Sequence, residues 1–223
     1  MKIIPFGENG VLVKFEQKIS AETNHKVVEL QRQLEEAYFP EITFVIPAFC
    51  SLTIGFSPYK TTFPKLKNRI LELKKTEKNL SVENSVLHKI PVCYHHSYSI
   101  DLQEVTNQTT LSKKEIIQLH TEQIFQIYMM GFLPGFAYLG PVPKALFTKR
   151  KKVPRKRVES GSIGLAGLQT GIYPMASPGG WQIIGRTPVE VFNHKKEQPF
   201  LFKTGDRVQF HSISVEEFEN YEN

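Results

Sequence analysis

The chain has 223 residues, of which 40% are hydrophobic and 22% charged, and this ordinary globular composition excludes a disordered protein. No apolar run approaches the roughly 20 residues of a membrane span, the N-terminus lacks a secretory signal, and Cys50 and Cys93 are too few for a disulfide framework, so we expect a reduced cytoplasmic protein without a membrane partner. The net charge of +6 comes from seven basic residues within positions 149–157, which lack interleaved aromatic residues, so we expect a solvated loop there and no nucleic-acid partner.

The first 94 residues are predicted to form an α+β domain. Alternating apolar residues predict a strand over 11–15, and Ser20 is a candidate N-cap for a helix that ends before Pro40. Strands are expected over 42–46 and 50–56, then a helix that starts near Pro64, and a last strand over 86–94. The resulting order β-α-β-β-α-β is that of a ferredoxin-like domain.

Residues 95–223 are predicted to form a second domain that is rich in strands. Two short helices are expected between residues 101 and 121, and Ser112 with Glu115 makes a capping box for the second helix. Beyond residue 125 the helical period fades, and ten of the 14 glycines lie between Gly131 and Gly185. This pattern indicates a small β-barrel with tightly turned loops.

Three glycine-rich segments carry the strongest functional signal. In the first, 131–136, the missing Cβ atoms let backbone N–H groups approach a ligand, and a tight turn held by core aromatics is an equal alternative. The second, 161–173, favours a lined pocket over a bulged strand pair because polar residues follow its regularly spaced glycines. The third, 177–187, holds the single tryptophan, which could stack on a ligand or plug the barrel. The candidate binding residues are Gly131, Phe132, Pro134, Gly135, Phe136, Gln169, Thr170, Tyr173, Ser177, Gly179, Gly180 and Trp181.

Other residue types limit the possible chemistry. His120 shares a helix face with Ile116 and Ile117, where a histidine is usually a core residue, although burial beside a pocket can tune its pKa. Arg186 is either an anion ligand or a surface ion pair. No Cys/His cluster has metal-ligand spacing and no Gly-x-Ser-x-Gly elbow occurs, so we expect neither a metal site nor a serine nucleophile. No Walker A loop or dinucleotide fingerprint occurs, so a nucleotide site would be of another kind or shared with a partner.

The order of these motifs resembles the allophanate hydrolase subunit 1 family, which is also called the KipI family or the family of 5-oxoprolinase B subunits. The resemblance extends through the C-terminal half, and the layout of the N-terminal half agrees. The matching segments are 92–94, Asp101-Leu102, Leu111-Ser112, His120, 128–136, Pro154-Arg155, Arg157-Val158, Gly161-Ser162, 169–174, 185–188 and 205–208. Glu159 and Leu168 depart from the family pattern beside the second glycine-rich segment.

The resemblance implies a cyclophilin-like barrel for the second domain and a role within an ATP-dependent 5-oxoprolinase made of several chains. The implied partners are the C subunit, related to allophanate hydrolase subunit 2, and the A subunit, and the implied cofactor is ATP, bound by the assembled complex. Together they would open 5-oxo-L-proline to L-glutamate. We hypothesise that Arg155, Arg157 and Arg186 supply positive charge, that the 131–135 loop supplies backbone donors, and that His120 carries a proton. In this hypothesis Gln169, Tyr173 and Ser177 orient the substrate.

Two alternative functions are open within the same family. One branch inhibits a sporulation sensor kinase by contacting its dimerisation domain. Fused relatives form the carboxyltransferase half of a urea carboxylase, a role that would require a biotin-bearing partner.

Overall fold

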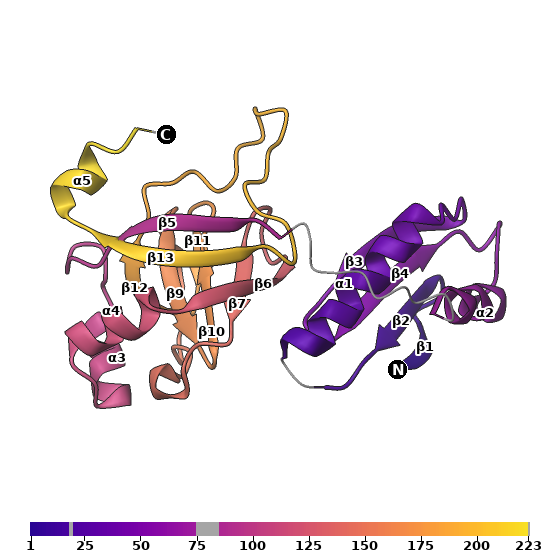
Figure 1. Ribbon diagram of the computed structural model, residues 1–223, viewed down its shortest axis with the longest axis horizontal. Coiled ribbons are helices and arrows are strands. Elements are labelled where there is room, and N and C mark those ends of the chain that lie inside the picture. Colours follow the sequence, from indigo (N-terminus) through magenta and orange to yellow (C-terminus); the bar gives the residue numbers. More distant parts are fainter. Residues whose placement is uncertain (18–19, 75–84, 223) are drawn as a thin grey trace. The chain divides into compact units, whose positions relative to one another are not determined.

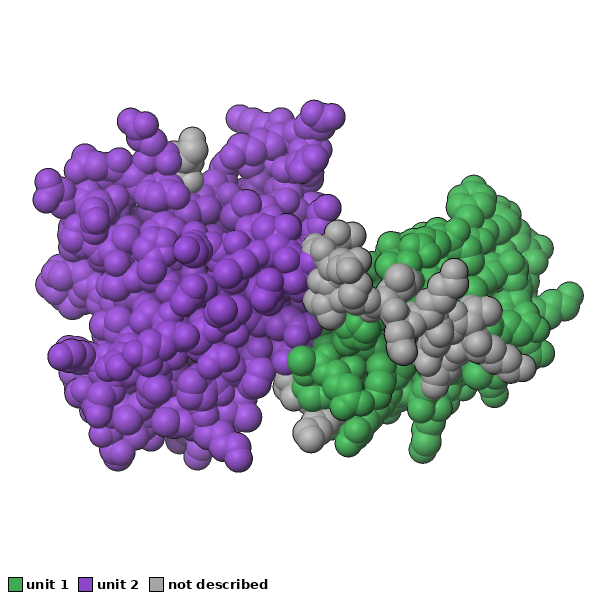
Figure 2. All heavy atoms as spheres, viewed as in Figure 1, with its two compact units in different colours: residues 1–84 green, residues 85–223 purple. Residues whose placement is uncertain are grey.

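The structure, a computed structural model, describes residues 1–17, 20–74 and 85–222 (Figure 1). The chain divides into two compact units, Met1–Asn84 and Ser85–Asn223 (Figure 2). Each unit has a hydrophobic core of its own. No helix in the described ranges is long and apolar enough to cross a membrane.

The N-terminal unit is a four-stranded antiparallel sheet with two helices on one face. Its elements are β1 (Lys2–Phe6), β2 (Gly10–Lys14), α1 (Ala21–Glu36), β3 (Ile42–Pro47), β4 (Ser51–Phe56) and α2 (Phe63–Lys74). The strand order is β1-β2-β4-β3. Alternate residues of β2, Val11 and Val13, are fully buried against the helices, and Leu30 of α1 and Leu66 of α2 belong to the same core. Ser20 caps α1 as predicted, because its hydroxyl accepts a hydrogen bond from the Thr23 N–H at 3.2 Å.

The predicted ferredoxin-like order of elements is not confirmed. The observed sheet begins with a strand that was not predicted, β1, which lies at the edge of the sheet, where Pro5 is tolerated. The strand predicted to end this domain, β5 (Leu87–Cys93), is present but belongs to the second unit. There β5 pairs in parallel with β13 (Arg207–Ile213) along its whole length. The boundary therefore falls between Asn84 and Ser85 and not at the predicted position 94/95.

The second unit is built around a closed barrel, as the glycine pattern predicts. After β5 come α3 (Leu102–Thr109), α4 (Lys113–Thr121), β6 (Ile124–Met130), β7 (Ala137–Gly140), the 3₁₀ helix η1 (Lys144–Leu146), β8 (Arg155–Val158), β9 (Ser162–Ala166), β10 (Gln169–Ile172), β11 (Ser177–Gly179), β12 (Gln182–Arg186), β13 and α5 (Val215–Glu219). The barrel order is β10-β7-β6-β13-β5-β12-β9, and β8 and β11 form a separate pair. The closed barrel is confirmed, and its finer likeness to cyclophilin stays a prediction.

Two helices lie between β5 and the next barrel strand, β6, at the predicted place. The capping box of α4 is formed, with the Glu115 N–H donating to the Ser112 hydroxyl at 3.3 Å and the Ser112 N–H donating to the Glu115 carboxylate at 2.8 Å. Ile116 and His120 form the buried side of this helix. Helix α3 packs against β12, which places Asp101, at the N-cap position of the helix, beside the start of that strand.

Candidate functional site

The three glycine-rich segments meet in one cluster of aromatic rings. Phe136 of the first segment lies edge-on to Tyr173 of the second, with ring centroids 5.1 Å apart, and to Trp181 of the third at 5.5 Å. All three side chains are buried. Tyr138 of β7 joins the cluster at 4.7 Å from Phe136 and 5.7 Å from Trp181. The three segments singled out by the sequence therefore pack against one another through these buried rings.

The loop between β6 and β7 requires glycine at position 135 for a steric reason. Gly135 has a φ of +84°, and a Cβ there would lie 2.5 Å from the Cβ of Phe192. The Gly131 N–H already donates to the Phe136 carbonyl at 3.1 Å, so it is not a free donor as predicted. Within the described part of the chain, the N–H groups of Phe132 and Gly135 have no hydrogen-bond acceptor. Pro134 and the Phe132 side chain are exposed.

A cavity of about 430 Å³ lies beside this cluster. It is lined by Tyr138, Phe147, Thr148, Lys149, Arg150, Ala166, Gly167, Gln169 and Trp181. The amide nitrogen of Gln169 is buried without a hydrogen-bond partner in the described structure, so it is a donor that a ligand carbonyl or carboxylate could satisfy. Together with the charges of Lys149 and Arg150, it makes a site suited to a small anionic ligand.

The tyrosines near the cavity remain protonated at neutral pH. Burial raises the pKa of Tyr138, and the charge of Arg150 only partly opposes this rise. Burial likewise raises the pKa of Tyr173, with opposing contributions from the Trp181 backbone and Arg150. Gly179 permits this packing, since a Cβ there would lie 2.5 Å from the Tyr173 hydroxyl. The phenols therefore keep their protons as possible donors.

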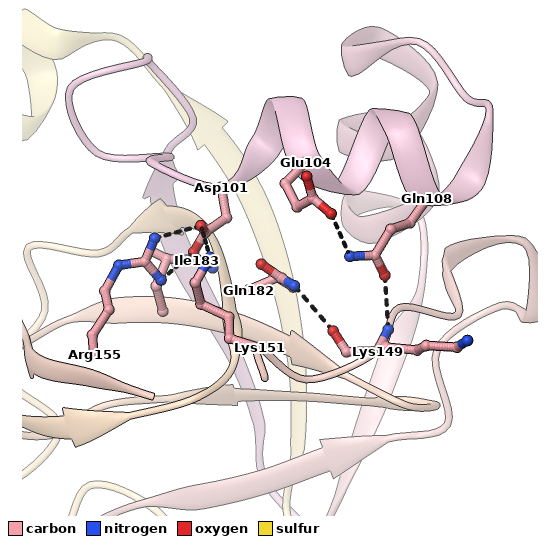
Figure 3. Close-up of polar contacts among 8 residues, drawn as sticks. All are labelled: Asp101, Glu104, Gln108, Lys149, Lys151, Arg155, Gln182 and Ile183. Atoms are coloured by element: carbon pink, nitrogen blue, oxygen red, sulfur yellow. Dashed lines mark hydrogen bonds and ion pairs between the residues drawn. The ribbon is translucent and has the colours of Figure 1, made fainter. Parts of the chain in front are cut away.

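A buried carboxylate anchors the basic segment 149–157 to the barrel (Figure 3). Asp101, only 3% exposed, accepts hydrogen bonds from Arg155 Nη1 at 2.7 Å, from Lys151 Nζ at 3.0 Å and from the Ile183 N–H at 2.8 Å. Burial raises the pKa of Asp101, but the bonds from Arg155, the Ile183 backbone and Lys151 outweigh it and hold this pKa below its ordinary value. Asp101 is therefore ionised at neutral pH.

The backbone of the basic segment is also tied down. The Lys149 N–H donates to the Gln108 side-chain carbonyl at 2.9 Å, and the Lys149 carbonyl accepts from Gln182 Nε2 at 3.0 Å (Figure 3). The Lys151 N–H donates to the Gly180 carbonyl at 2.8 Å. Most of the segment is exposed, as predicted for a solvated loop, but these backbone bonds and the Asp101 carboxylate fix it on the barrel, and its last three residues belong to β8.

His120 occupies the core and not the cavity. Its Nδ1 lies 2.7 Å from the Tyr94 hydroxyl and its Nε2 lies 3.0 Å from the Thr170 hydroxyl, and the ring stacks on Phe210. Burial lowers the pKa of His120 to about 3, so the ring is neutral near pH 7. This environment does not support the predicted role of proton carrier, and it assigns Thr170 to the core as well.

The three predicted catalytic arginines do not line the cavity described above. Arg155 is paired with Asp101. Arg157 is exposed and paired with Glu159, with a nitrogen–oxygen distance of 2.7 Å. Arg186 donates through Nε to the Ser160 carbonyl at 2.7 Å. Each arginine is thus bonded to a different group of the protein, although the charges of Arg157 and Arg186 both lower the pKa of Glu159, so their predicted role in supplying charge to a substrate stays a prediction.

Several residues that build the site were missed by sequence reasoning. Lys149 and Arg150 were set aside as part of a solvated run, and Tyr138 and Phe147 carried no local signal. Of the predicted binding residues, Gln169 and Trp181 line the cavity, while the Ser177 hydroxyl donates to the Pro178 carbonyl. No group of His, Cys, Asp and Glu residues able to hold a metal ion occurs in the described ranges.

The chain matches one protein family and is similar to 5-oxoprolinase B subunits over nearly its whole length. A family model described as "Carboxyltransferase domain, subdomain C and D" matches residues 1–202. The 5-oxoprolinase B subunit of Bacillus subtilis is 36% identical over 99% of this chain and 96% of its own length. The 5-oxoprolinase B subunit of Haemophilus influenzae is 36% identical over 94% of this chain and 97% of its own length.

Solved structures agree with this placement. The crystal structure of TTHA0988 has a TM-score of 0.81 and 34% identity, covering 92% of this chain, which spans 40% of that longer protein. PH0987 from Pyrococcus horikoshii has a TM-score of 0.59 and 34% identity over 97% of this chain and 100% of its own length. The K. lactis urea amidolyase, 18% identical with a TM-score of 0.81, shares the fold over 97% of this chain and 15% of its own length.

Proposed function

The chain belongs to the carboxyltransferase domain, subdomain C and D, family, and from that premise we propose that it is the B subunit of an ATP-dependent 5-oxoprolinase complex. The proposal is supported by the two full-length relatives that bear this name at 36% identity. The complex would convert 5-oxo-L-proline to L-glutamate. The A and C subunits of that enzyme are the proposed partners.

The cavity beside Trp181 is the proposed place of the lactam, and the unpartnered amide nitrogen of Gln169 is the observation that carries this assignment. 5-Oxoproline is small and carries one carboxylate and one lactam carbonyl, both of which only accept hydrogen bonds. Gln169 Nε2 would donate to one of these groups, and Lys149 and Arg150 would balance the negative charge. The faces of Trp181 and Tyr138 would exclude water from the ring.

ATP would supply the phosphoryl group that activates the lactam oxygen and makes the ring carbon susceptible to water. The residues of this chain would contribute charge at that oxygen. Lys149 and Arg150 are both placed beside the proposed lactam cavity and make no ion pair within the described structure. Negative charge that develops on the phosphorylated oxygen would be stabilised by these two cations.

The proposal is tested by reconstitution. The chain is co-expressed with candidate A and C subunits, and glutamate release from 5-oxoproline is measured with and without ATP. The matched control omits this chain alone. We expect glutamate only from the complete, ATP-containing mixture. An assembled complex that releases none would overturn the proposal.

A carboxyltransferase role is the second candidate. It is favoured by the family description and by the urea amidolyase of Lachancea kluyveri, which is 23% identical over 98% of this chain, although the match covers 13% of that protein. That identity is lower than the identity to the 5-oxoprolinase chains, so we place it second. The sensor-kinase inhibitor stays a prediction. A biotin requirement of the complex, or kinase inhibition by the free chain, would distinguish the three.

A further inference from the structure

A second cavity lies on the other side of the basic segment, toward α3. Its volume is about 670 Å³, within the range of sites that hold nucleotide-sized ligands. Its walls include Phe147, Lys149, Arg150, Lys152, Glu104 and Gln182. Phe147, Lys149 and Arg150 also line the first cavity, so the two cavities are neighbours.

Three cations at this second cavity have no ion-pair partner among the residues that the structure describes. Lys151 and Arg155 are paired with Asp101, and Arg157 with Glu159. In the described part of the chain, Lys149, Arg150 and Lys152 form no ion pair. Because the Lys149 backbone is fixed by Gln108 and Gln182, little backbone entropy is lost when a ligand binds at this wall.

A buried acceptor at the same wall lacks a partner. Gln182 is 2% exposed, and its Nε2 donates to the Lys149 carbonyl, which fixes which end of the amide is the oxygen. The Oε1 atom has no hydrogen-bond partner within the described residues. A buried acceptor left unpaired destabilises the folded protein. A ligand that donates an N–H to Oε1 would remove this cost.

We infer that this second cavity binds a nucleoside triphosphate. Its phosphates would lie on Lys149, Arg150 and Lys152, its base would stack on Phe147, which is 50% exposed, and an N–H of the base would donate to Gln182 Oε1. The inference deepens the proposed function and rests on it for the identity of the phosphoryl donor. The phosphoryl donor and the lactam would then lie in neighbouring cavities that share Lys149 and Arg150.

The test is calorimetric titration of the full chain with ATP and with inorganic triphosphate. We expect ATP to bind more tightly than triphosphate, because only ATP can use Phe147 and Gln182. Lys152→Gln should weaken ATP binding by about fivefold, the upper range for one exposed ion pair. Glu104→Gln should strengthen it by about twofold, because a negative charge leaves the wall while the acceptor for Gln108 remains.

Lys156→Gln is the matched control. Lys156 is an exposed cation of the same segment that lines neither cavity, so its removal changes the net charge equally and should leave ATP binding unchanged. The inference is overturned if ATP does not bind, if triphosphate binds as tightly as ATP, or if Lys156→Gln and Lys152→Gln weaken binding equally.

The binding result and the reconstitution result are independent. A complex that releases glutamate while the free chain binds no ATP would reject this site and keep the proposed function. A free chain that binds ATP with the expected variant pattern, in a complex that releases no glutamate, would keep the site and reject the proposed function.

Discussion

Asp101 connects the helix α3 both to the basic segment, through Lys151 and Arg155, and to the strand β12, through the Ile183 N–H. It precedes the first residue of α3 but makes no side-chain cap, because its carboxylate is used by Arg155, Lys151 and the Ile183 backbone. These partners lie 50 to 82 residues away in the chain. The carboxylate therefore holds together parts of the site that no local interaction would align.

We predict that Asp101→Asn destabilises the protein by about 2 kcal/mol. Two cations would lose a buried counterion, and their partial exposure reduces the usual cost of breaking such a pair. The free energy of unfolding is measured in urea. Glu159→Gln is the control, because it removes the exposed partner of Arg157 and should change stability by less than about 0.5 kcal/mol. Equal losses in the two variants would contradict the anchoring role.

His120 should make stability depend on pH between about 5 and 7. Its pKa falls from 6.5 to about 3 on burial, so the unfolded chain binds a proton that the folded chain refuses. Stability is full above pH 6.5 and falls as the pH drops below it, by about 2 kcal/mol at pH 5. The stabilising contribution of Asp101 is fully present above its ordinary pKa of 3.8 and is lost only below that pH, outside this window.

Urea unfolding of the wild type and His120→Gln at pH 5 and pH 7 measures this contribution. The difference in stability between the two pH values should shrink by about 2 kcal/mol in the variant. An unchanged difference would show that His120 is not held neutral in the core.

At the residue scale the sequence indicated which aromatic residues meet, but not which basic residues are already paired with a carboxylate. Phe136, Tyr173 and Trp181 meet as their glycine-rich segments predicted. Arg155 and Arg157 alternate along one short strand, and the sequence alone could not show that each has a carboxylate partner. The partner of Arg157 is two residues away, but that of Arg155 is 54 residues away, beyond any local pattern.

Helices α4 and α5 begin with the same motif but should respond differently to its loss. Ser112 and Ser214 each complete a capping box. Helix α4 buries Ile116 and His120, whereas α5 has no buried residue. We predict that Ser112→Ala costs about 1 kcal/mol of global stability, while Ser214→Ala only frays the chain end. Urea unfolding of the two variants compares them, and an equal loss would contradict this assignment.

Most individual elements were predictable, but their allocation to sheets was not. Caps, alternating apolar residues and prolines located α1, β2, β3, β4 and α4. The strand β5 was also found, but its pattern of buried residues is the same whether it completes the first sheet or the barrel. Its hydrogen-bond partner β13 starts 120 residues later, at Arg207 opposite Leu87. Pairing over that distance depends on the whole barrel closing.

For the whole molecule, the boundary at Ser85 makes a prediction about fragments. Residues 85–223 should fold alone and unfold cooperatively, because the fragment retains the closed barrel and its core. Residues 95–223 lack β5, which would open the barrel between β13 and β12 and remove Ile90 and Val92 from its core. Circular dichroism during urea unfolding of both fragments checks this. A cooperative 95–223 fragment would contradict the boundary.

The measurement that tests the central claim most directly is the KM for 5-oxoproline of the assembled complex carrying Gln169→Leu. The account predicts a rise of about tenfold, because a donated hydrogen bond to a charged or activated group is lost. Gln118→Leu, on the exposed side of α4, is the control and should leave the KM unchanged. A Gln169→Leu complex with wild-type KM and kcat would contradict the claim that this cavity holds the lactam.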